Sequence, residues 1–302
     1  MAKKTKRHGF IYKLIVSLLV ILLVLGAAAA YFRFSAWDFY KNAEKVFVIP
    51  EINDGFIPGG IAYDEETGNF LVCGRYTGND RSALFAVTGE NTYKKLLLTD
   101  KDGSFSGIEA QDVAICGKFV YVLCKDGVFV YEKEDISNSQ SGKAEYKGKL
   151  FSDTKADFLC ADGDVLYVGK SGRMYEYGLS EKNALGVSEE CLRVYLLPED
   201  TQSVSVKDGG FFVITKRGIG ASGLYYCDAK TAADKGKTEI EGEKAPCFSV
   251  AATMIEKEIK LPAMTTDAAN ADGYLYMLSD FASNKYLFGK LTGARWAYRI
   301  KA

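Results

Sequence analysis

Lysine recurs immediately before a tight turn in three predicted β-hairpins of this sequence, at Lys125, Lys170 and Lys216. Strand-forming runs flank each turn, and glycine lies within it. Counting back 13 residues from each lysine reaches an acidic or hydroxyl side chain, namely Asp112, Asp157 and Ser203. A further copy has Asp280 in place of the lysine, with Asp267 13 residues before it. The constant offset predicts that these basic and acidic side chains gather on one face of the fold.

Two kinds of chemistry fit such a mixed group of charges. Convergent polar side chains around a hollow are typical of a ligand site, whereas neighbouring opposite charges can simply form stabilising ion pairs. The copy with two acids is the most informative, because like charges brought together need a cation, a basic partner or a raised pKa. We therefore predict a ligand-binding set that also includes a nearby glutamate and consists of Glu109, Asp112, Asp157, Asp267, Asp280, Lys125, Lys170 and Lys216.

No cofactor and no catalytic residue are predicted from these positions. Calcium, held by Glu109, Asp112, Asp157 and Asp267, is the alternative, since oxygen ligands suit that ion. None of the four lies in a DxDxDG-type loop. The one histidine, His8, precedes the long apolar run near the N-terminus, so the remainder holds no Ser-His-Asp triad, Cys-His pair or histidine-ligated metal.

The N-terminus has the pattern of a signal anchor. Residues 1–13 are basic, and residues 14–32, LIVSLLVILLVLGAAAAYF, form an uncharged run of 19 residues, about enough to span a bilayer as a helix. The positive-inside rule then places residues 1–13 in the cytoplasm, residues 33–45 as a juxtamembrane stalk and residues 46–302 outside the membrane. A cleaved signal peptide is the alternative, because the alanines at 27–30 could be cut. We favour the anchor, because the apolar run continues past the alanines.

The charge and cysteine content narrow the class of protein further. The chain carries −1 overall and its tail five positive charges, which leaves the exported part mildly acidic and indicates no nucleic-acid partner. All seven cysteines lie in that part, most of them in apolar strand-like runs. Their odd number and their spacing favour buried free thiols, with one or two disulfides as the alternative.

Residues 46–302 show an all-β pattern with an internal repeat. Segments such as ADGDVLYVGK (161–170), KDGGFFVITK (207–216) and ADGYLYMLSD (271–280) share Asp-Gly followed by an apolar strand. Successive strand centres near Leu71, Val120, Leu166, Phe212 and Leu275 are 49, 46, 46 and 63 residues apart. Such periods are typical of β-propeller blades. We favour five blades, in which case the long last interval holds an insertion within 230–260. The alternative is a sixth blade in this interval.

Closure of the ring requires the two ends of the propeller sequence to pair. The strand VFVIP (46–50) is expected to complete the last blade, beside RWAYRI (295–300). In a propeller the first strand of each blade lines the central channel, so the predicted charges would surround one mouth of that channel.

The segments IPGGIAYDEETGNFLVCG, DVAICGKFVYVLCKDGVFVYE and LPAMTTDAANADGYLYMLSDFASNKYLFGK resemble blades of exported bacterial β-propellers of the broad NHL and gluconolactonase-like kind. The resemblance covers about residues 55–300 and is one of pattern. It implies a secreted or membrane-tethered propeller, in some members an enzyme with a channel metal held by Glu, Asn and Asp. Those ligands have no residue-by-residue match in this sequence.

The sequence therefore favours a single-pass membrane protein with an extracytoplasmic propeller that binds a ligand through its channel face without catalysis. An envelope protein or glycan is the expected partner, besides the membrane itself. The alternative is a carboxylate- or metal-dependent hydrolase or cyclase at the same mouth.

Overall fold

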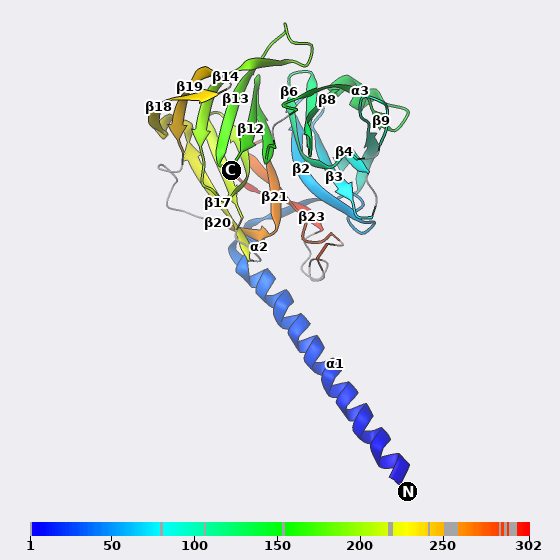
Figure 1. The fold of residues 1–302 in the computed structure, drawn as a ribbon. Coiled ribbons are helices and arrows are strands. Elements are labelled where there is room, and N and C mark those ends of the chain that lie inside the picture. Colours follow the sequence, from blue (N-terminus) through cyan, green and yellow to red (C-terminus); the bar gives the residue numbers. More distant parts are fainter. Residues whose placement is uncertain are drawn as a thin grey trace.

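The computed structural model describes residues 2–78, 81–105, 107–152, 155–216, 220–240, 242–250, 259–283, 285–286, 289 and 295–302. A long helix, α1 (Ala2–Ser35), projects from a β-structure that contains the C-terminus (Figure 1). Its segment Gly9–Ser35 has a mean hydropathy of 2.7 and is long and apolar enough to cross a membrane, as an anchor or a signal sequence would be. The predicted stalk, 33–45, holds the end of α1, the short helix α2 (Trp37–Asn42) and the start of the first strand.

The described strands form five sheets, each of which is one blade of a propeller. Blade one contains β2 (Phe56–Asp64), β3 (Asn69–Tyr76), β4 (Ser82–Gly89), β5 (Thr92–Leu98) and the short β9 (Lys143–Ala144). Blade two contains β6 (Ala110–Cys116), β7 (Phe119–Cys124), β8 (Gly127–Glu132) and β10 (Tyr146–Leu150), with α3 (Lys133–Asn138) after β8. Blade three begins with β11 (Phe158–Asp162), β12 (Val165–Lys170), β13 (Arg173–Leu179) and β14 (Val187–Leu196).

Blade four contains β15 (Thr201–Lys207), β16 (Gly210–Thr215), β17 (Ala221–Asp228) and β20 (Ile259–Ala263). Blade five contains β21 (Thr265–Ala271), β22 (Tyr274–Ser279), β23 (Trp296–Lys301) and β1 (Glu44–Val48). The predicted pairing of the two ends is therefore confirmed: β1 runs antiparallel to β23, with Glu44 opposite Arg299 and Val48 opposite Trp296. The N-terminal strand closes the ring and covers the edge of β23.

The long interval before the last blade holds an insertion. After the turn η1 (Ala229–Thr231), the hairpin β18 (Ala233–Ile240) and β19 (Glu243–Ser249) leaves blade four in the chain. It joins the sheet of blade three, where β19 pairs in parallel with β14. The described part of this interval therefore extends an existing blade, and residues 251–258 lie outside the described residues.

Apolar clusters hold consecutive blades together. One cluster joins Leu71 and Leu84 of blade one to Val113 and Val122 of blade two, all fully or almost fully buried. Burial of such side chains is the main stabilising contribution to a fold of this kind. The first strands β2, β6, β11, β15 and β21 neighbour one another in a closed ring, as the repeat predicts. All seven cysteines are free thiols, and all but the half-buried Cys191 are buried.

Candidate functional site

The first strands of four blades carry an irregularity at the same level of the channel. The pairing register shifts between Pro58 and Gly60 in β2 and at the matching places in β6, β15 and β21. Each shift leaves one extra residue opposite the neighbouring strand, and the extra residues are Gly59, Gln111, Gln202 and Thr266. Bulges of this kind re-aim side chains and are frequent beside functional sites.

We call the level of the channel at which the residue after each bulge lies the waist. Two of the residues at this level are the aspartates Asp112 and Asp267. Their exposed fractions are 3% and 2%. Asp112 Oδ2 accepts a hydrogen bond from the Leu159 N–H of blade three at 2.8 Å. Asp267 Oδ2 accepts one from the Ile61 N–H of blade one at 2.7 Å, and its Oδ1 accepts one from the Ser203 hydroxyl. Asp112 therefore ties blade two to blade three, and Asp267 ties blade five to blades one and four.

The two waist carboxyl groups also interact directly with each other. Burial and then the Asp267 charge raise the pKa of Asp112 well above its usual range. Burial raises the pKa of Asp267 to about 6, against the opposing effect of its hydrogen bonds. Burial and the mutual repulsion of two carboxylates therefore both favour the protonated form of this pair.

Glycine is required at the waist position of blade one. A Cβ atom on Gly60 would overlap the Oδ1 and Cα atoms of Asp112. The carboxyl group of blade two therefore fills the space that a side chain of blade one would otherwise take.

Blade three departs from the predicted offset by one residue. Phe158 pairs with Gly169, and the Asp157 N–H donates to the same Gly169 carbonyl at 2.7 Å. The waist position of this blade is therefore Phe158. The N–H of the next residue, Leu159, donates to Asp112 just as the N–H of Ile61 donates to Asp267. The Asp157 carboxylate instead accepts from the Ser171 N–H of the following turn at 2.7 Å.

A cavity opens above the waist on the side where the bulges lie. It has a volume of about 210 Å³. Its lining draws on all five blades and includes the residues before each waist position, namely Gly59, Gln111, Asp157, Gln202 and Thr266. Arg75, Asp112, Asp280 and Lys285 also line it. We name this end of the channel the helix-side mouth.

A second cavity of about 130 Å³ adjoins the first one, at blades four and five. The two cavities share Gln202, Thr266, Asp280 and Lys285, and the second one adds Lys216, Ser222 and Tyr286. Asp280 Oδ2 pairs with the Lys285 ammonium at 3.2 Å. Burial raises the pKa of Asp280, while Lys285, Lys216 and Arg75 act in the opposite direction.

Two buried polar atoms at this mouth have no hydrogen-bond partner among the described residues: Asp280 Oδ1 and Thr266 Oγ1. An unsatisfied buried polar atom costs on the order of 1–3 kcal/mol. Met264, whose carbonyl accepts from the Asp280 N–H at 3.1 Å, has a left-handed φ of +55°. Unsatisfied atoms and backbone strain gathered at a cavity are typical of a binding site.

The structure brings together only part of the predicted set. Asp112, Asp157, Asp280 and Lys216 line the two cavities, and Asp267 lies beneath them. Glu109 pairs with Arg75 at 3.2 Å on the rim. Lys125 and Lys170 are absent from both linings, within the part of the chain that the structure describes. The sequence did not single out Gln202, Thr266 and Lys285. The only feature that could have located them is their position in the sequence next to a waist residue or near Asp280.

The described residues do not fit the alternative calcium site. Asp112 and Asp267 are held by donors of neighbouring strands, Asp157 accepts from the Ser171 N–H, and Glu109 pairs with Arg75. No three acidic, histidine or cysteine side chains in the described ranges are grouped closely enough to hold a metal ion. We therefore derive no chemistry through a metal at this mouth.

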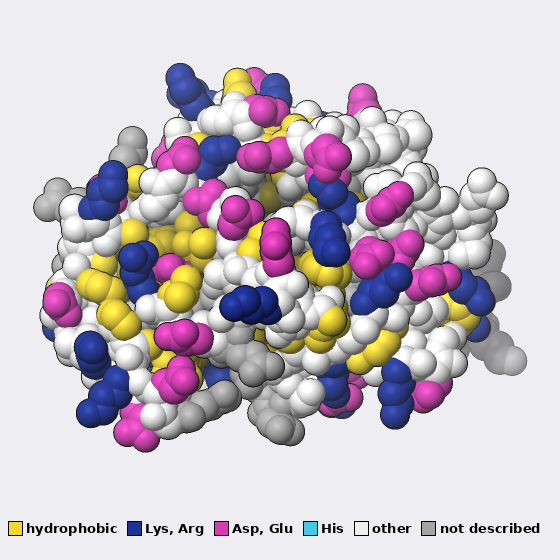
Figure 2. Space-filling view, turned by 90° about the horizontal axis from the view of Figure 1, so that it is seen from above, with side chains coloured by type: hydrophobic (Ala, Val, Ile, Leu, Met, Phe, Trp, Pro, Cys, Tyr) yellow, Lys and Arg dark blue, Asp and Glu magenta, His cyan; other side chains and the backbone are white. Residues whose placement is uncertain are grey.

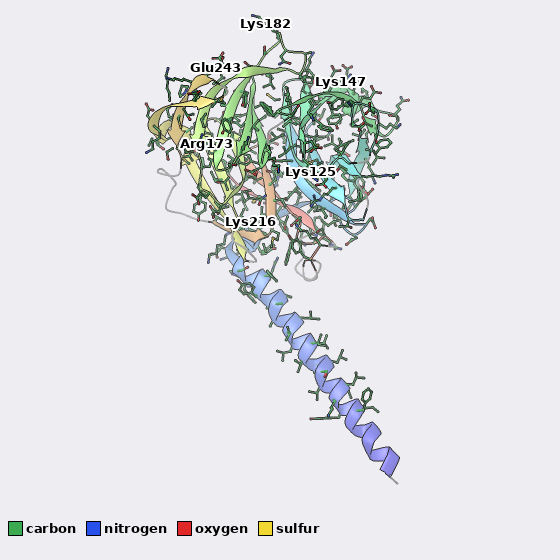
Figure 3. All side chains as sticks on the ribbon, in the orientation of Figure 1. Lys125, Lys147, Arg173, Lys182, Lys216 and Glu243 are labelled. Atoms are coloured by element: carbon green, nitrogen blue, oxygen red, sulfur yellow. The ribbon has the colours of Figure 1, made fainter. Side chains whose placement is uncertain are left out.

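Two further hollows lie elsewhere on the propeller. The far mouth of the channel forms a cavity of about 250 Å³, where the buried Asn270 Oδ1 has no partner among the described residues. Figure 2 shows the face turned away from α1, where acidic and basic side chains are interspersed. A wider groove of about 740 Å³ runs between the loop after β13 and the β18–β19 hairpin, beside Lys182 and Glu243 (Figure 3). Burial raises the pKa of its thiol, Cys191, to about 11, which leaves that thiol protonated at neutral pH.

Comparison with known proteins gives similarity of fold only. Neither a protein-family model nor a curated protein sequence matches this chain. Glutaminyl cyclase from Myxococcus xanthus has 13% identity and a TM-score of 0.47, covering 86% of this chain and 94% of its own. The PQQ-bound aldose sugar dehydrogenase from Streptomyces coelicolor has 10% identity and a TM-score of 0.46, covering 85% and 96%. A putative glucose dehydrogenase from Thermus thermophilus has 11% identity and a TM-score of 0.43, covering 85% and 98%.

These TM-scores are all below 0.5, so they carry no argument about this chain. Its architecture rests on the strand pairing itself. The pairing defines a β-propeller, with five blades among the described residues, preceded by one apolar helix long enough to cross a membrane.

Proposed function

We propose that this protein is a membrane-anchored, extracytoplasmic β-propeller that binds a small polar ligand, or the polar end of a larger one, in its helix-side mouth. The observation that carries the proposal is the pair of buried unpartnered atoms, Asp280 Oδ1 and Thr266 Oγ1, beside Lys216 and Lys285. A ligand that donates to these two oxygens would remove the cost of leaving them unsatisfied. An envelope glycan or a side chain of an envelope protein has groups of this kind.

A binding role is favoured over catalysis by the state of the reactive groups. The waist carboxyl groups accept hydrogen bonds from neighbouring blades, which gives them a structural role. The buried thiols nearest the waist, Cys73 and Cys160, have pKa values raised well above the usual range by burial, so neither forms a nucleophilic thiolate. The propeller also contains no histidine.

The alternative function is a carboxylate-dependent hydrolase or cyclase, and one observation favours it. Asp112, which lines the larger cavity, lies beside Asp267, and the pKa values of both carboxyl groups are raised. Two carboxyl groups with separated pKa values can supply a general acid and a general base. A turnover that disappears in the Asp112→Asn variant would establish this alternative over the binding role.

Native mass spectrometry of the full chain tests the proposed function. The protein is released from membranes in a mild detergent, and its mass is compared with that of two variants. We expect a small-molecule adduct on the wild type that is lost in Asp280→Asn. The adduct is retained in Glu190→Gln, a matched change at the wide groove. Spectra that are identical for the wild type and Asp280→Asn would contradict the proposal.

A further inference from the structure

The exposed aromatic residues of α1 and of the start of α2 mark where a bilayer would lie. Tyr12 at one end and Tyr31 at the other are 70% and 59% exposed, and Phe34 and Trp37 follow at 64% and 51%. At 1.5 Å per residue, Tyr12 and Tyr31 are about 28 Å apart, close to the ~30 Å thickness of a hydrocarbon core. Aromatic side chains at both ends of an apolar helix are typical of the two membrane interfaces. The outer interface then lies at Tyr31 to Trp37.

The propeller contacts α1 at this same level, through blade five. The Phe32 ring, next to Tyr31, packs on the Phe281 ring with 4.7 Å between centroids. Phe281 directly follows Asp280, whose carboxylate lines both cavities of the helix-side mouth. The cavity at blades four and five is therefore held beside the outer interface.

The labelled residues of Figure 3 agree with this placement. Lys216 lies at the end of the propeller next to α1 and α2, Lys125 and Arg173 are farther away, and Lys182 and Glu243 are at the opposite end. The β20 strand, which precedes the Met264 turn, also contacts both α1 and α2. Blades four and five thus form the side of the mouth nearest the membrane.

The polar groups of the smaller cavity complement a ligand that carries one positive and one negative group. The carboxylate oxygen Asp280 Oδ1 has no partner among the described residues, and an ammonium group is its strongest complement. The Lys216 ammonium, at the same cavity, has no ion pair within the described ranges and complements a phosphate. With volumes of about 130 and 210 Å³, the two cavities are smaller than the ~300–1,000 Å³ of sites that enclose a whole ligand. They suit the head group of a larger molecule whose remainder stays outside the two cavities.

We propose that the helix-side mouth binds the head of a membrane phospholipid that carries a primary ammonium next to its phosphate. The ammonium donates to Asp280 Oδ1 and Thr266 Oγ1, the phosphate contacts Lys216, and the acyl chains remain in the bilayer around α1. This inference rests on the proposed function, since it names the ligand of the same site.

Calorimetric titration of the full chain with a soluble head group tests the chemistry. In phospholipid-free micelles we expect glycerophosphoethanolamine to bind, and glycerophosphocholine and inorganic phosphate to bind at least tenfold more weakly. Because the bond to the carboxylate is charge-assisted, Asp280→Asn should weaken binding by about tenfold or more. Lys216→Ala should weaken it severalfold. Lys125→Ala, the same turn position in blade two but outside both linings, should change it less than twofold.

The same titration in nanodiscs tests whether the head group comes from the membrane. Phosphatidylethanolamine in the nanodisc should occupy the mouth and weaken glycerophosphoethanolamine binding at least fivefold, relative to nanodiscs of phosphatidylcholine alone. Equal binding in the two nanodiscs would mean that the site takes a soluble molecule, and equal binding of phosphate would exclude the ammonium contact. Either result overturns this inference. An Asp280-dependent adduct in the mass spectra without any head-group binding would overturn it too, while leaving the proposed function in place.

Discussion

The waist of the channel holds a pair of buried carboxyl groups, Asp112 and Asp267, whose pKa values are raised. In the unfolded chain, both aspartates titrate near pH 4. In the folded state the pKa of Asp267 is raised to about 6, and that of Asp112 is raised well above its usual range. Between about pH 4 and 6 the folded protein therefore holds protons that the unfolded chain has released. Its free energy of unfolding falls as pH rises through this window, by about 1.4 kcal/mol per pH unit for each retained proton.

Asp112→Asn removes one member of the pair and should flatten this pH dependence. The amide is neutral at every pH, so it ends the repulsion and leaves one fewer proton to lose. Chemical denaturation of the full chain at several pH values from 4 to 8 would measure the change. We expect the free energy of unfolding of the variant, relative to the wild type, to increase with pH. Parallel pH profiles for the two proteins would show that the waist pair is not protonated in the folded state.

At the scale of elements, the ring is closed by a strand from the other end of the chain. Phe47 on β1 is 2% exposed, and its ring lies 5.5 Å from that of Phe70 on blade one. Strand β1 therefore joins blade five in its hydrogen bonds and blade one in its packing. The Arg299 guanidinium of β23 adds an ion pair with Glu44 at 2.6 Å.

Phe47→Ala should loosen this closure. Deletion of a buried phenylalanine side chain typically costs about 3–5 kcal/mol. Urea denaturation of the full chain would measure the loss in the free energy of unfolding. As a control, Glu239→Ala on the exposed strand β18 should change it by less than about 0.5 kcal/mol. A comparably small effect of Phe47→Ala would show that the ring is stable without the β1 contact.

For the molecule as a whole, the sequence was enough to predict the architecture. The Asp-Gly repeats mark the first hairpin of blades three, four and five, and VFVIP closes the ring as expected. The destination of the β18–β19 hairpin was not predictable, because its pairing with β14 joins segments distant in the chain. The candidate site was predicted in part. The constant offset located Asp112 and Asp267, but it was wrong by one residue at Asp157, since register depends on where each bulge falls.

The orientation of the mouth depends on how α1 packs on blade five, and no local pattern in the sequence encodes that contact. The Phe32 and Phe281 rings meet across nearly the whole length of the chain. With α1 as the proposed membrane anchor, the same contact would place the candidate ligand site beside the membrane, which is the central claim of the proposal.

Photo-crosslinking of the full chain in nanodiscs tests that claim most directly. The exposed Lys216 and the exposed Lys182 are each replaced, in separate proteins, by p-benzoylphenylalanine, and lipid adducts are counted by mass spectrometry after irradiation. We predict lipid adducts at position 216, beside α1, and essentially none at position 182, at the opposite end of the propeller (Figure 3). Adducts at position 182, or equal yields at the two positions, would contradict a mouth held at the membrane surface.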